Sequence, residues 1–331
     1  MQENETAPEK PSLSAAFNAV AQEAVADYPA LAGRFILVDL QEGQIHGIPN
    51  LMVTKFRSVE EVEKYLNDKA QKAIEQNTSN SVYDGTRGGL GVIFYNGDAQ
   101  QPIFGTSDVE NALGVIDHEL GHILIPGGMD STTPDASIKS ENKADLFSAL
   151  RKARRDGEDD IAGTRLLAFT RARALILSGN EETQEHFTTF SLMKLAEMMR
   201  TTPMHKLQPQ MAVGMAEMLG DQYSPSAERV KALAEAFTPC RGMDPRLGAE
   251  GVARNIASVT TAPDASDDVF KLGSFVMSFY LNGQIRVHGK PLKLEGAFWD
   301  DVREKIAARE AQPKAPAGLI LFASGASNGP S

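Results

Sequence analysis

The sequence contains a single cysteine, Cys240, among 331 residues. One cysteine cannot form an intrachain disulfide, and no cluster of thiolates is present to hold a metal ion. Any metal site in this chain must therefore use histidine, aspartate or glutamate side chains. Cys240 itself is predicted to be a small buried hydrophobic residue, because it lies far in the sequence from any histidine-rich stretch.

The chain also lacks a run of eighteen apolar residues, so the sequence predicts no transmembrane helix. Its N-terminal stretch, residues 1–14 (MQENETAPEKPSLS), is polar and has no apolar core of a signal peptide. This stretch resembles the spacer that follows a cleaved export signal, which suggests a periplasmic or secreted protein. A cytoplasmic chain with a frayed N-terminus has the same pattern, so both compartments stay open.

An excess of positive charge is absent as well. The chain has 33 lysines and arginines against 44 aspartates and glutamates, a formal net charge of -11. A chain this acidic is not expected to bind nucleic acid or an anionic membrane as its main partner. The hydrophobic share of 42% and the charged share of 23% are typical of a soluble globular protein with a sizeable core.

Hydrophobic periodicity divides the chain into a mixed N-terminal part and a mainly helical C-terminal part. Before residue 100 it predicts strands over 34–40, 50–56 and 88–96 and helices over 14–27 and 58–76. After residue 107 it predicts helices over 108–124, 137–155, 159–178, 181–200, 203–219, 226–237, 245–259, 268–281 and 297–311, and a short hairpin over 283–294. This pattern is typical of an α+β protein.

The same pattern predicts how the chain is organised. Residues 1–12 and 313–331 are expected to be tails, residues 13–125 an α/β part with a mixed sheet, and residues 126–312 a mainly helical part. The helix over 108–124 lies at the junction of these two parts. Ser107 and Glu110 form a capping-box pattern at its start, and the Pro-Gly-Gly stretch after it ends the helix.

The junction helix contains the stretch HELGH, residues 118–122. Positions four apart lie on one face of a helix, so His118 and His122 can direct imidazole nitrogens at a single ion. Neutral imidazoles hold Zn²⁺ without cancelling its charge, and the ion then lowers the pKa of a bound water toward ~7. Glu119, beside that water, can take its proton as general base. The H-E-x-x-H pattern therefore predicts a zinc site built for hydrolysis.

Two core histidines on a buried helix are the alternative interpretation, because Ile116, Leu120 and Ile123 make the same helix apolar. In a chain with six histidines, a chance match to this pattern is expected on the order of once in a hundred such sequences. The surrounding residues have to decide between the two interpretations.

A catalytic zinc site needs three protein ligands and one open position. Gly128 stands where the extended pattern H-E-x-x-H-x-x-G-x-x-H requires a third histidine, which excludes that pattern. Glu141 follows His122 after eighteen intervening residues, enough for a reversing loop and the first turn of an antiparallel helix. We therefore expect Glu141 to be the third ligand. Asp145, one turn later, could accept the outer N–H of a ligating histidine.

With these carboxylates in place, the chain resembles the gluzincin branch of the HExxH zinc metallopeptidases. The resemblance covers about thirty residues and is specific for the site. It implies that His118, His122 and Glu141 are zinc ligands, that Glu119 is the general base, and that Asp145 supports a ligating histidine. It also implies a zincin-like fold, with the site between two helices beneath the edge of a mixed sheet, and a peptide or protein substrate.

The chain departs from one branch of that family. Aminopeptidases of this kind carry a G-x-M-E-N motif upstream on a strand, whereas the nearest match here, GGMD over 127–130, follows the site. Aminopeptidase specificity is therefore not expected. We expect the strand stretch GVIFYN, residues 91–96, to offer an unpaired backbone edge that takes an extended peptide by strand addition.

Other residues stay open as candidates. His186 could donate a hydrogen bond to the oxyanion of a tetrahedral intermediate, as a downstream histidine does in thermolysin-like enzymes, or it could be a core residue on the helix over 181–200. Tyr95 and Tyr223 are alternatives for the oxyanion role. Asp130 and Asp135 are alternatives to the glutamate as third ligand.

The sequence thus predicts a peptidase that uses one zinc ion per chain. A non-catalytic zincin-like binding module, with a structural metal or none, is the second hypothesis. Hydrolysis of a non-peptide amide by the same machinery is the third. The glutamate at 119 favours an enzyme, because a purely structural metal site has no use for an adjacent base.

Overall fold

A four-stranded sheet begins the fold, in a computed structural model that describes residues 13–99, 107–125, 133–242 and 248–312. The strand order is β2-β1-β4-β3. The central strands β1 (Phe35–Asp39) and β4 (Leu90–Tyr95) run parallel, and each is buried at every position, which explains their continuous apolar sequences. The edge strands β2 (Gln44–His46) and β3 (Asn80–Asp84) are both antiparallel to their neighbours.

Two predictions about this sheet are wrong. The segment predicted as a strand over 50–56 contains a short helix, α2 (Leu51–Thr54), because the Asn50 side chain caps the backbone N–H groups of Met52 and Val53. The stretch 91–96 is not a free edge, since β4 pairs with β1 on one side and with β3 on the other. In the described sheet the outermost strand next to β4 is β3, and its short, mostly polar sequence does not predict a strand.

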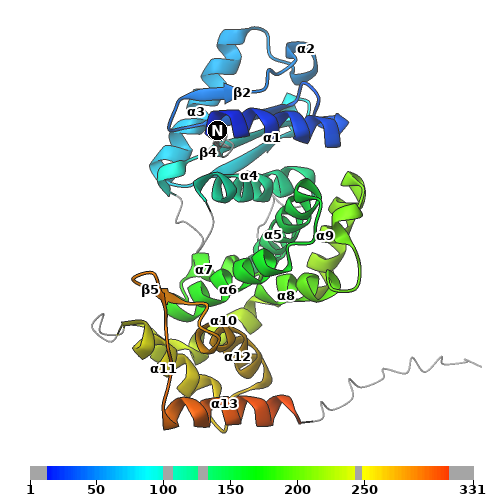
Figure 1. Cartoon of the computed structure of the whole chain (residues 1–331). Coiled ribbons are helices and arrows are strands. Elements are labelled where there is room, and N and C mark those ends of the chain that lie inside the picture. The colour runs from blue at the N-terminus through cyan, green and yellow to red at the C-terminus, as the bar shows by residue number, and fades with distance from the viewer. Residues whose placement is uncertain (1–12, 100–106, 126–132, 243–247, 313–331) are drawn as a thin grey trace, which may run out of the picture. The chain divides into compact units, whose positions relative to one another are not determined.

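Helices cover both faces of the sheet. On one face α3 (Val59–Gln76) packs through Val62, Leu66 and Ala73 against side chains of β1 and β4. On the other face lie α1 (Leu13–Asp27) and α4 (Asp108–Leu124), which also contact each other (Figure 1). The capping box predicted for α4 is confirmed, with the serine and glutamate at its N-terminus bonding each other's backbone N–H groups.

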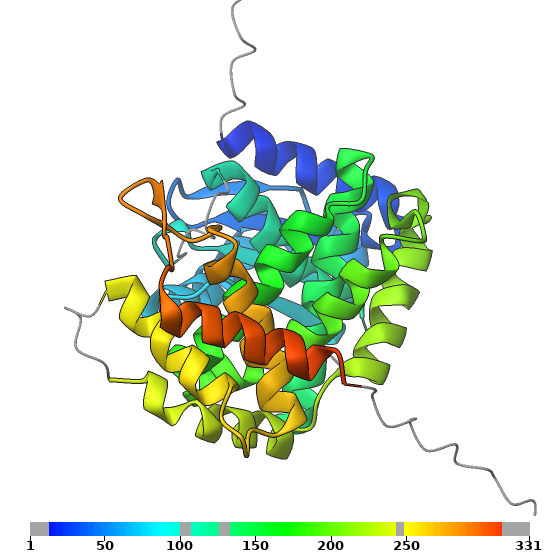
Figure 2. The same cartoon turned by 60° about the horizontal axis from the view of Figure 1, so that its bottom comes forward.

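The remaining helices of this unit build outward from α4. The long helix α5 (Pro134–Asp156) packs on α4 and on α9 (Pro209–Tyr223), and Figures 1 and 2 both show α9 running alongside α5. Helix α6 (Ile161–Leu177) packs on α8 (Thr189–Met198), while α7 (Glu181–Glu185) and α10 (Ala227–Ala236) contact each other. The elements α1 to α10 belong to one compact unit, Met1–Gly242.

The second compact unit is Met243–Ser331. Its described part contains α11 (Gly248–Thr260), α12 (Asp267–Leu281) and α13 (Ala297–Glu310). The predicted hairpin is confirmed and consists of β5 (Arg286–Val287) and β6 (Lys290–Pro291). The tails predicted over 1–12 and 313–331 lie outside the described residues.

The chain is therefore α+β, as the sequence predicts, with a small mixed sheet near the N-terminus and a mainly helical remainder. The compact units divide after residue 242, so the helices α5 to α10, which follow the junction helix, share a unit with the sheet. A metal site between α4 and α5 consequently lies inside one unit.

Candidate metal centre

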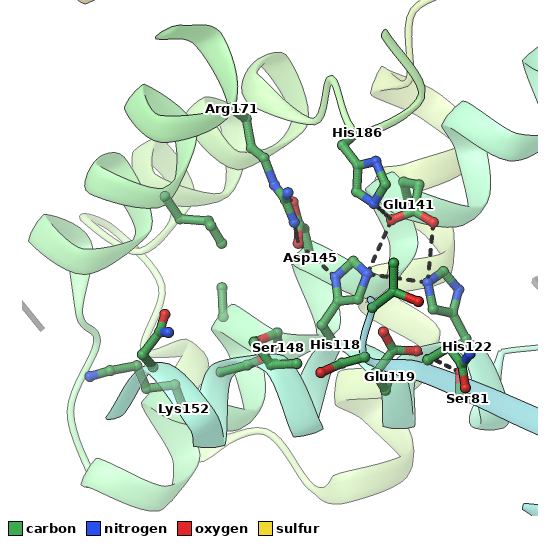
Figure 3. A pocket seen from close by; sticks show the side chains of 18 of the residues that line it. Ser81, His118, Glu119, His122, Glu141, Asp145, Ser148, Lys152, Arg171 and His186 are labelled. Atoms are coloured by element: carbon green, nitrogen blue, oxygen red, sulfur yellow. Dashed lines mark hydrogen bonds and ion pairs between the residues drawn. The ribbon is translucent and has the colours of Figure 1, made fainter. Parts of the chain in front are cut away.

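A cleft of about 990 Å³ runs along α4 and α5 in the first unit. The edge strand β3 forms one wall, and α6 with the end of α7 forms another (Figure 3). Its lining includes every residue that the sequence assigned to the site: His118, Glu119, His122, Glu141, Asp145 and His186. The structure thus brings together side chains from α4, α5 and the segment after α7.

Three of these residues form a group that could hold a metal ion: His118, His122 and Glu141. The two histidine Nε2 atoms are 3.2 Å apart. Glu141 places Oε2 3.1 Å from His118 Nε2 and Oε1 3.3 Å from His122 Nε2 (Figure 3). The three side chains are largely buried, with exposed fractions of 12%, 12% and 15%.

The glycine inside the HELGH stretch explains how Glu141 reaches the histidines. Gly121 lies on the face of α4 that meets α5, where an added Cβ would stand only 3.0 Å from the Ala144 backbone. Without a side chain at this position, the two helices can approach closely. Ala144 follows Glu141 on α5, so the close approach also places the glutamate against the histidines.

Polar atoms in this group fit a bound cation. His118 Nδ1 lies 2.7 Å from Asp145 Oδ1 and His122 Nδ1 lies 3.0 Å from Ser140 Oγ, so the Nε2 atoms are the ones left to face the centre. Glu141 Oε2 is buried and accepts no hydrogen bond from any described residue. Buried polar atoms normally have hydrogen-bond partners, and a buried carboxylate whose nearest polar neighbours are imidazole nitrogens forms with them a set of donor atoms suited to a metal ion.

The electrostatics of the group point the same way. Burial lowers the pKa of His118, but the carboxylates of Asp145 and Glu141 outweigh burial and raise it to about 10. Burial raises the pKa of Glu141, but His186, His118 and His122 outweigh burial and hold it well below its usual range. The surroundings therefore favour positive charge at His118, which a proton or a metal cation can supply.

Asp145 is the most heavily bonded carboxylate of the site. Its Oδ1 lies against His118 Nδ1 and accepts from Arg171 Nη2 at 2.9 Å, and its Oδ2 accepts from Arg171 Nε at 2.9 Å and from Thr188 Oγ1 at 2.6 Å. Burial raises the pKa of Asp145, but Arg171 and then His118 outweigh it and hold that pKa well below its usual range. An ionised Asp145 selects the His118 tautomer with a proton on Nδ1.

Glu119 is held from the edge strand. Its Oε2 accepts a hydrogen bond of 2.7 Å from Ser81 Oγ on β3 (Figure 3). The sequence does not predict Ser81 as a site residue, because it does not predict the strand that carries Ser81. The stretch N-S-V-Y-D is short, mostly polar and without polar-apolar alternation, so it does not distinguish a strand from a loop.

His186 lies at the end of α7, not inside a longer helix. The prediction of one helix over 181–200 is wrong, because the chain turns between α7 and α8, where Thr188 bonds to Asp145. His186 Nδ1 donates to the Glu182 carbonyl at 2.9 Å, and its Nε2 lies 3.3 Å from Glu141 Oε2. Its side chain is 35% exposed and faces the cleft (Figure 3).

The other candidates lie away from this group. Asp135 is in the first turn of α5 and accepts from the Ala227 backbone N–H at 2.6 Å, so it is not part of the metal-binding group. Tyr95 is buried against Phe17 of α1, and Tyr223 ends α9; neither lines the cleft. Asp130 lies outside the described residues.

Comparisons with known proteins add no assignment. No protein-family model matches the chain, and it has no significant match among curated proteins or solved structures. Among the described helices, none is both long and apolar enough to cross a membrane. Function therefore has to be inferred from the geometry of the site.

Proposed function

We propose that this protein is a zinc-dependent peptidase with a zincin-like fold. The observation that carries the proposal is the size of the His118, His122 and Glu141 triangle. A tetrahedral Zn²⁺ with bonds of ~2.0–2.1 Å holds neighbouring ligand atoms ~3.3 Å apart. The spacing measured here is close to that value: the two histidine Nε2 atoms are 3.2 Å apart, and the nearer oxygens of the Glu141 carboxylate lie 3.1 Å from His118 Nε2 (Oε2) and 3.3 Å from His122 Nε2 (Oε1). Two imidazoles and one carboxylate are also a ligand set of catalytic zinc sites, which keep a fourth position open.

The side chains around this triangle suit hydrolysis of an amide bond. A bound zinc ion would polarise the attacked carbonyl and make a neighbouring water more acidic. Glu119, next to His118 on α4, is placed to remove a proton from that water and return it to the departing amine. Ser81 orients the Glu119 carboxylate through its hydrogen bond. We assign His186, which faces the cleft, to donate to the oxygen of the attacked carbonyl.

The wall of the cleft favours an extended peptide as substrate. Within the described part of the chain, strand β3 pairs with β4 alone, and β3 residues line the cleft. An extended chain can add to such an edge through backbone hydrogen bonds. A sheet edge lying over the metal-binding helix is also the arrangement expected from the resemblance to the gluzincins.

A non-catalytic binding module is the alternative that the site argues against. A structural metal needs only its ligands, but here a fourth side chain, Glu119, is held in the cleft by Ser81. Hydrolysis of a non-peptide amide would use the same residues. A peptide is favoured over such a substrate, because an extended peptide can form backbone hydrogen bonds with β3 at the wall of the cleft.

The test measures metal content and hydrolysis in matched variants. The purified protein should bind about one zinc per chain, and His118→Ala or Glu141→Ala should lose it. Glu182→Ala is the control for the removal of a carboxylate, because Glu182 lines the same cleft but contacts the site only through its backbone carbonyl. Glu119→Gln should keep the zinc and lose hydrolysis of a peptide mixture followed by mass spectrometry.

Each outcome bears on a separate part of the proposal. Full zinc occupancy in Glu141→Ala would overturn the ligand assignment. Unchanged hydrolysis by Glu119→Gln would overturn the role of the base. A protein that holds zinc and hydrolyses no peptide would leave the binding module, or the non-peptide amide, as the function.

A further inference from the structure

The cleft has a second polar end, about two helical turns from the metal-binding group. Asn111 lies on α4 seven residues before His118, so the two residues share a face of the helix. Asn111 lines the cleft and is only 7% exposed. Its side-chain amide has no hydrogen-bond partner among the described residues. Because the rest of this side chain is buried and its amide faces the open cleft, the amide can bond only to water or to a ligand that enters the cleft.

Carboxylates dominate the charge at this end. Lys152 of α5 is the only cation there among the described lining residues, and its Nζ lies 2.6 Å from Asp156 and 2.8 Å from Asp160. Glu110 of α4 lines the same end of the cleft. Lys152 is thus paired with two carboxylates, and Glu110 adds a third negative charge to the same end of the cleft. The excess negative charge disfavours an anionic ligand and favours a cationic one.

The direction of a bound peptide follows from how β3 lies over α4. Ser81 of β3 contacts Glu119, and Gly91, which flanks the later end of β3, would place a Cβ 2.8 Å from Ile123. Residue numbers thus increase in the same direction along β3 and α4. A peptide added antiparallel to β3, the commoner and more stable pairing, runs the opposite way. Its residues after the cleaved bond then lie toward Asn111.

The distance from His118 to Asn111 along α4 gives the number of peptide residues between the cleaved bond and Asn111. Seven residues of α-helix span ~10 Å, at 1.5 Å per residue. An extended chain advances ~3.3 Å per residue, so ~10 Å corresponds to about three residues. The third residue after the cleaved bond therefore reaches the level of Asn111.

From these observations we infer that Asn111, Glu110, Lys152 and Asp160, which line the cleft, form a subsite for a lysine or arginine side chain three residues after the cleaved bond, and that Asp156 beside Lys152 offsets the charge of that ammonium group. The Asn111 carbonyl oxygen accepts a hydrogen bond from the cationic group, and the surplus carboxylates pair with its charge. The substrate class is a basic peptide that continues past the cleaved bond. This inference rests on the proposed peptidase function.

The first test uses three peptides that differ only at the third position after the cleaved bond, with lysine, alanine or glutamate there. Cleavage by the zinc-loaded protein is followed by mass spectrometry, which also identifies the bond that is cut. We expect kcat/KM to be about tenfold higher for the lysine peptide than for the glutamate peptide, with alanine between them. Equal values for the three peptides would overturn the subsite.

One variant and its control test whether the charge at this end of the cleft causes the preference for lysine. Asp156→Lys should abolish the lysine preference, because the end of the cleft then has two carboxylates and two ammonium groups; a lysine near the C-terminus of α5 also suits the helix dipole. Asp68→Lys is the matched control, because it makes the same charge change at an exposed site on α3, across the sheet. An unchanged preference in Asp156→Lys would overturn the electrostatic argument.

The role of the Asn111 side-chain amide is tested by comparing a peptide that reaches the subsite with one that is too short to reach it. Asn111→Leu should lower kcat/KM for the lysine peptide several-fold, but not for a peptide that ends one residue after the cleaved bond and cannot reach the subsite. Equal losses on both peptides would overturn the role of Asn111. If this variant does not fold, the three-peptide comparison on the unmodified protein still decides. A protein that cleaves no peptide overturns the proposed function, whereas cleavage without a lysine preference overturns only the subsite.

Discussion

Asp145 accepts hydrogen bonds from three side chains at once, so Asp145→Asn tests how the metal-binding group is held in place. Asparagine has the same size but only one acceptor oxygen. Four N–H or O–H groups from His118, Arg171 and Thr188 now converge on the carboxylate. Each carboxylate oxygen accepts two of these bonds, so two donors would face the new amide NH₂ group, and Arg171 would lose its counter-charge.

The expected magnitude follows from these losses. Breaking a buried ion pair by removing one partner costs about 3–5 kcal/mol. Arg171 is 26% exposed, so water can replace part of the interaction, and we expect about 3 kcal/mol of lost stability. Loss of the carboxylate that orients a ligating histidine typically weakens metal binding 10–100-fold. Asp145→Asn should therefore bind zinc about 10–100-fold more weakly than the unmodified protein.

Two measurements check this prediction. Competition with a chromophoric chelator gives the zinc affinity, and urea denaturation of the metal-free protein gives the free energy of unfolding. Asp135→Asn is the control, because it makes the same change on the same helix where the carboxylate accepts from a backbone N–H remote from the site. A zinc affinity in Asp145→Asn equal to that of the control would refute the idea that Asp145 orients His118.

Four further predictions concern the general base, the buried ion pair between α4 and α5, the close contact of these two helices at Gly121, and removal of the metal. Ser81→Ala should keep zinc and lower kcat about tenfold with little change in KM, and Ser81→Thr should restore it; steady-state kinetics on a peptide decide. Arg151→Met removes a fully buried partner of Asp117 at 2.8 Å, and urea denaturation should show a loss of about 3 kcal/mol. Gly121→Ala should cost about 1–3 kcal/mol in the same assay, because its methyl group meets the α5 backbone. A chelator should lower the thermal midpoint of the loaded protein, since zinc binds the folded state; an unchanged midpoint would contradict a resident metal.

Features that depend on neighbouring residues were predicted well from the sequence. The helix predicted over 108–124 is confirmed as Asp108–Leu124, because its capping box and its apolar spacing act within a few residues of each other. The strand over 34–40 is confirmed as Phe35–Asp39, since a continuous apolar run buries both faces. Local signals of this kind need no knowledge of the rest of the chain.

Features that depend on distant residues were missed. The strand β3 is held by pairing with β4, and only that pairing makes Ser81 a neighbour of the base. The break between α7 and α8 follows from Thr188 bonding to Asp145, a residue 43 positions earlier. The hydrophobic periodicity of the sequence predicts neither the pairing of β3 with β4 nor the hydrogen bond from Thr188 to Asp145.

For the candidate site itself, the sequence determined which side chains are available and how they are spaced. His118 and His122 face one way because they are four residues apart on one helix, and that relation is local. The tertiary structure alone decided that α5 packs close enough at Gly121 to bring Glu141 within 3.1–3.3 Å of both imidazoles. It also decided that β3 is the open edge of the cleft and that Asn111 marks its far end. Helical spacing is a property of the backbone, whereas these contacts depend on how separate elements pack together.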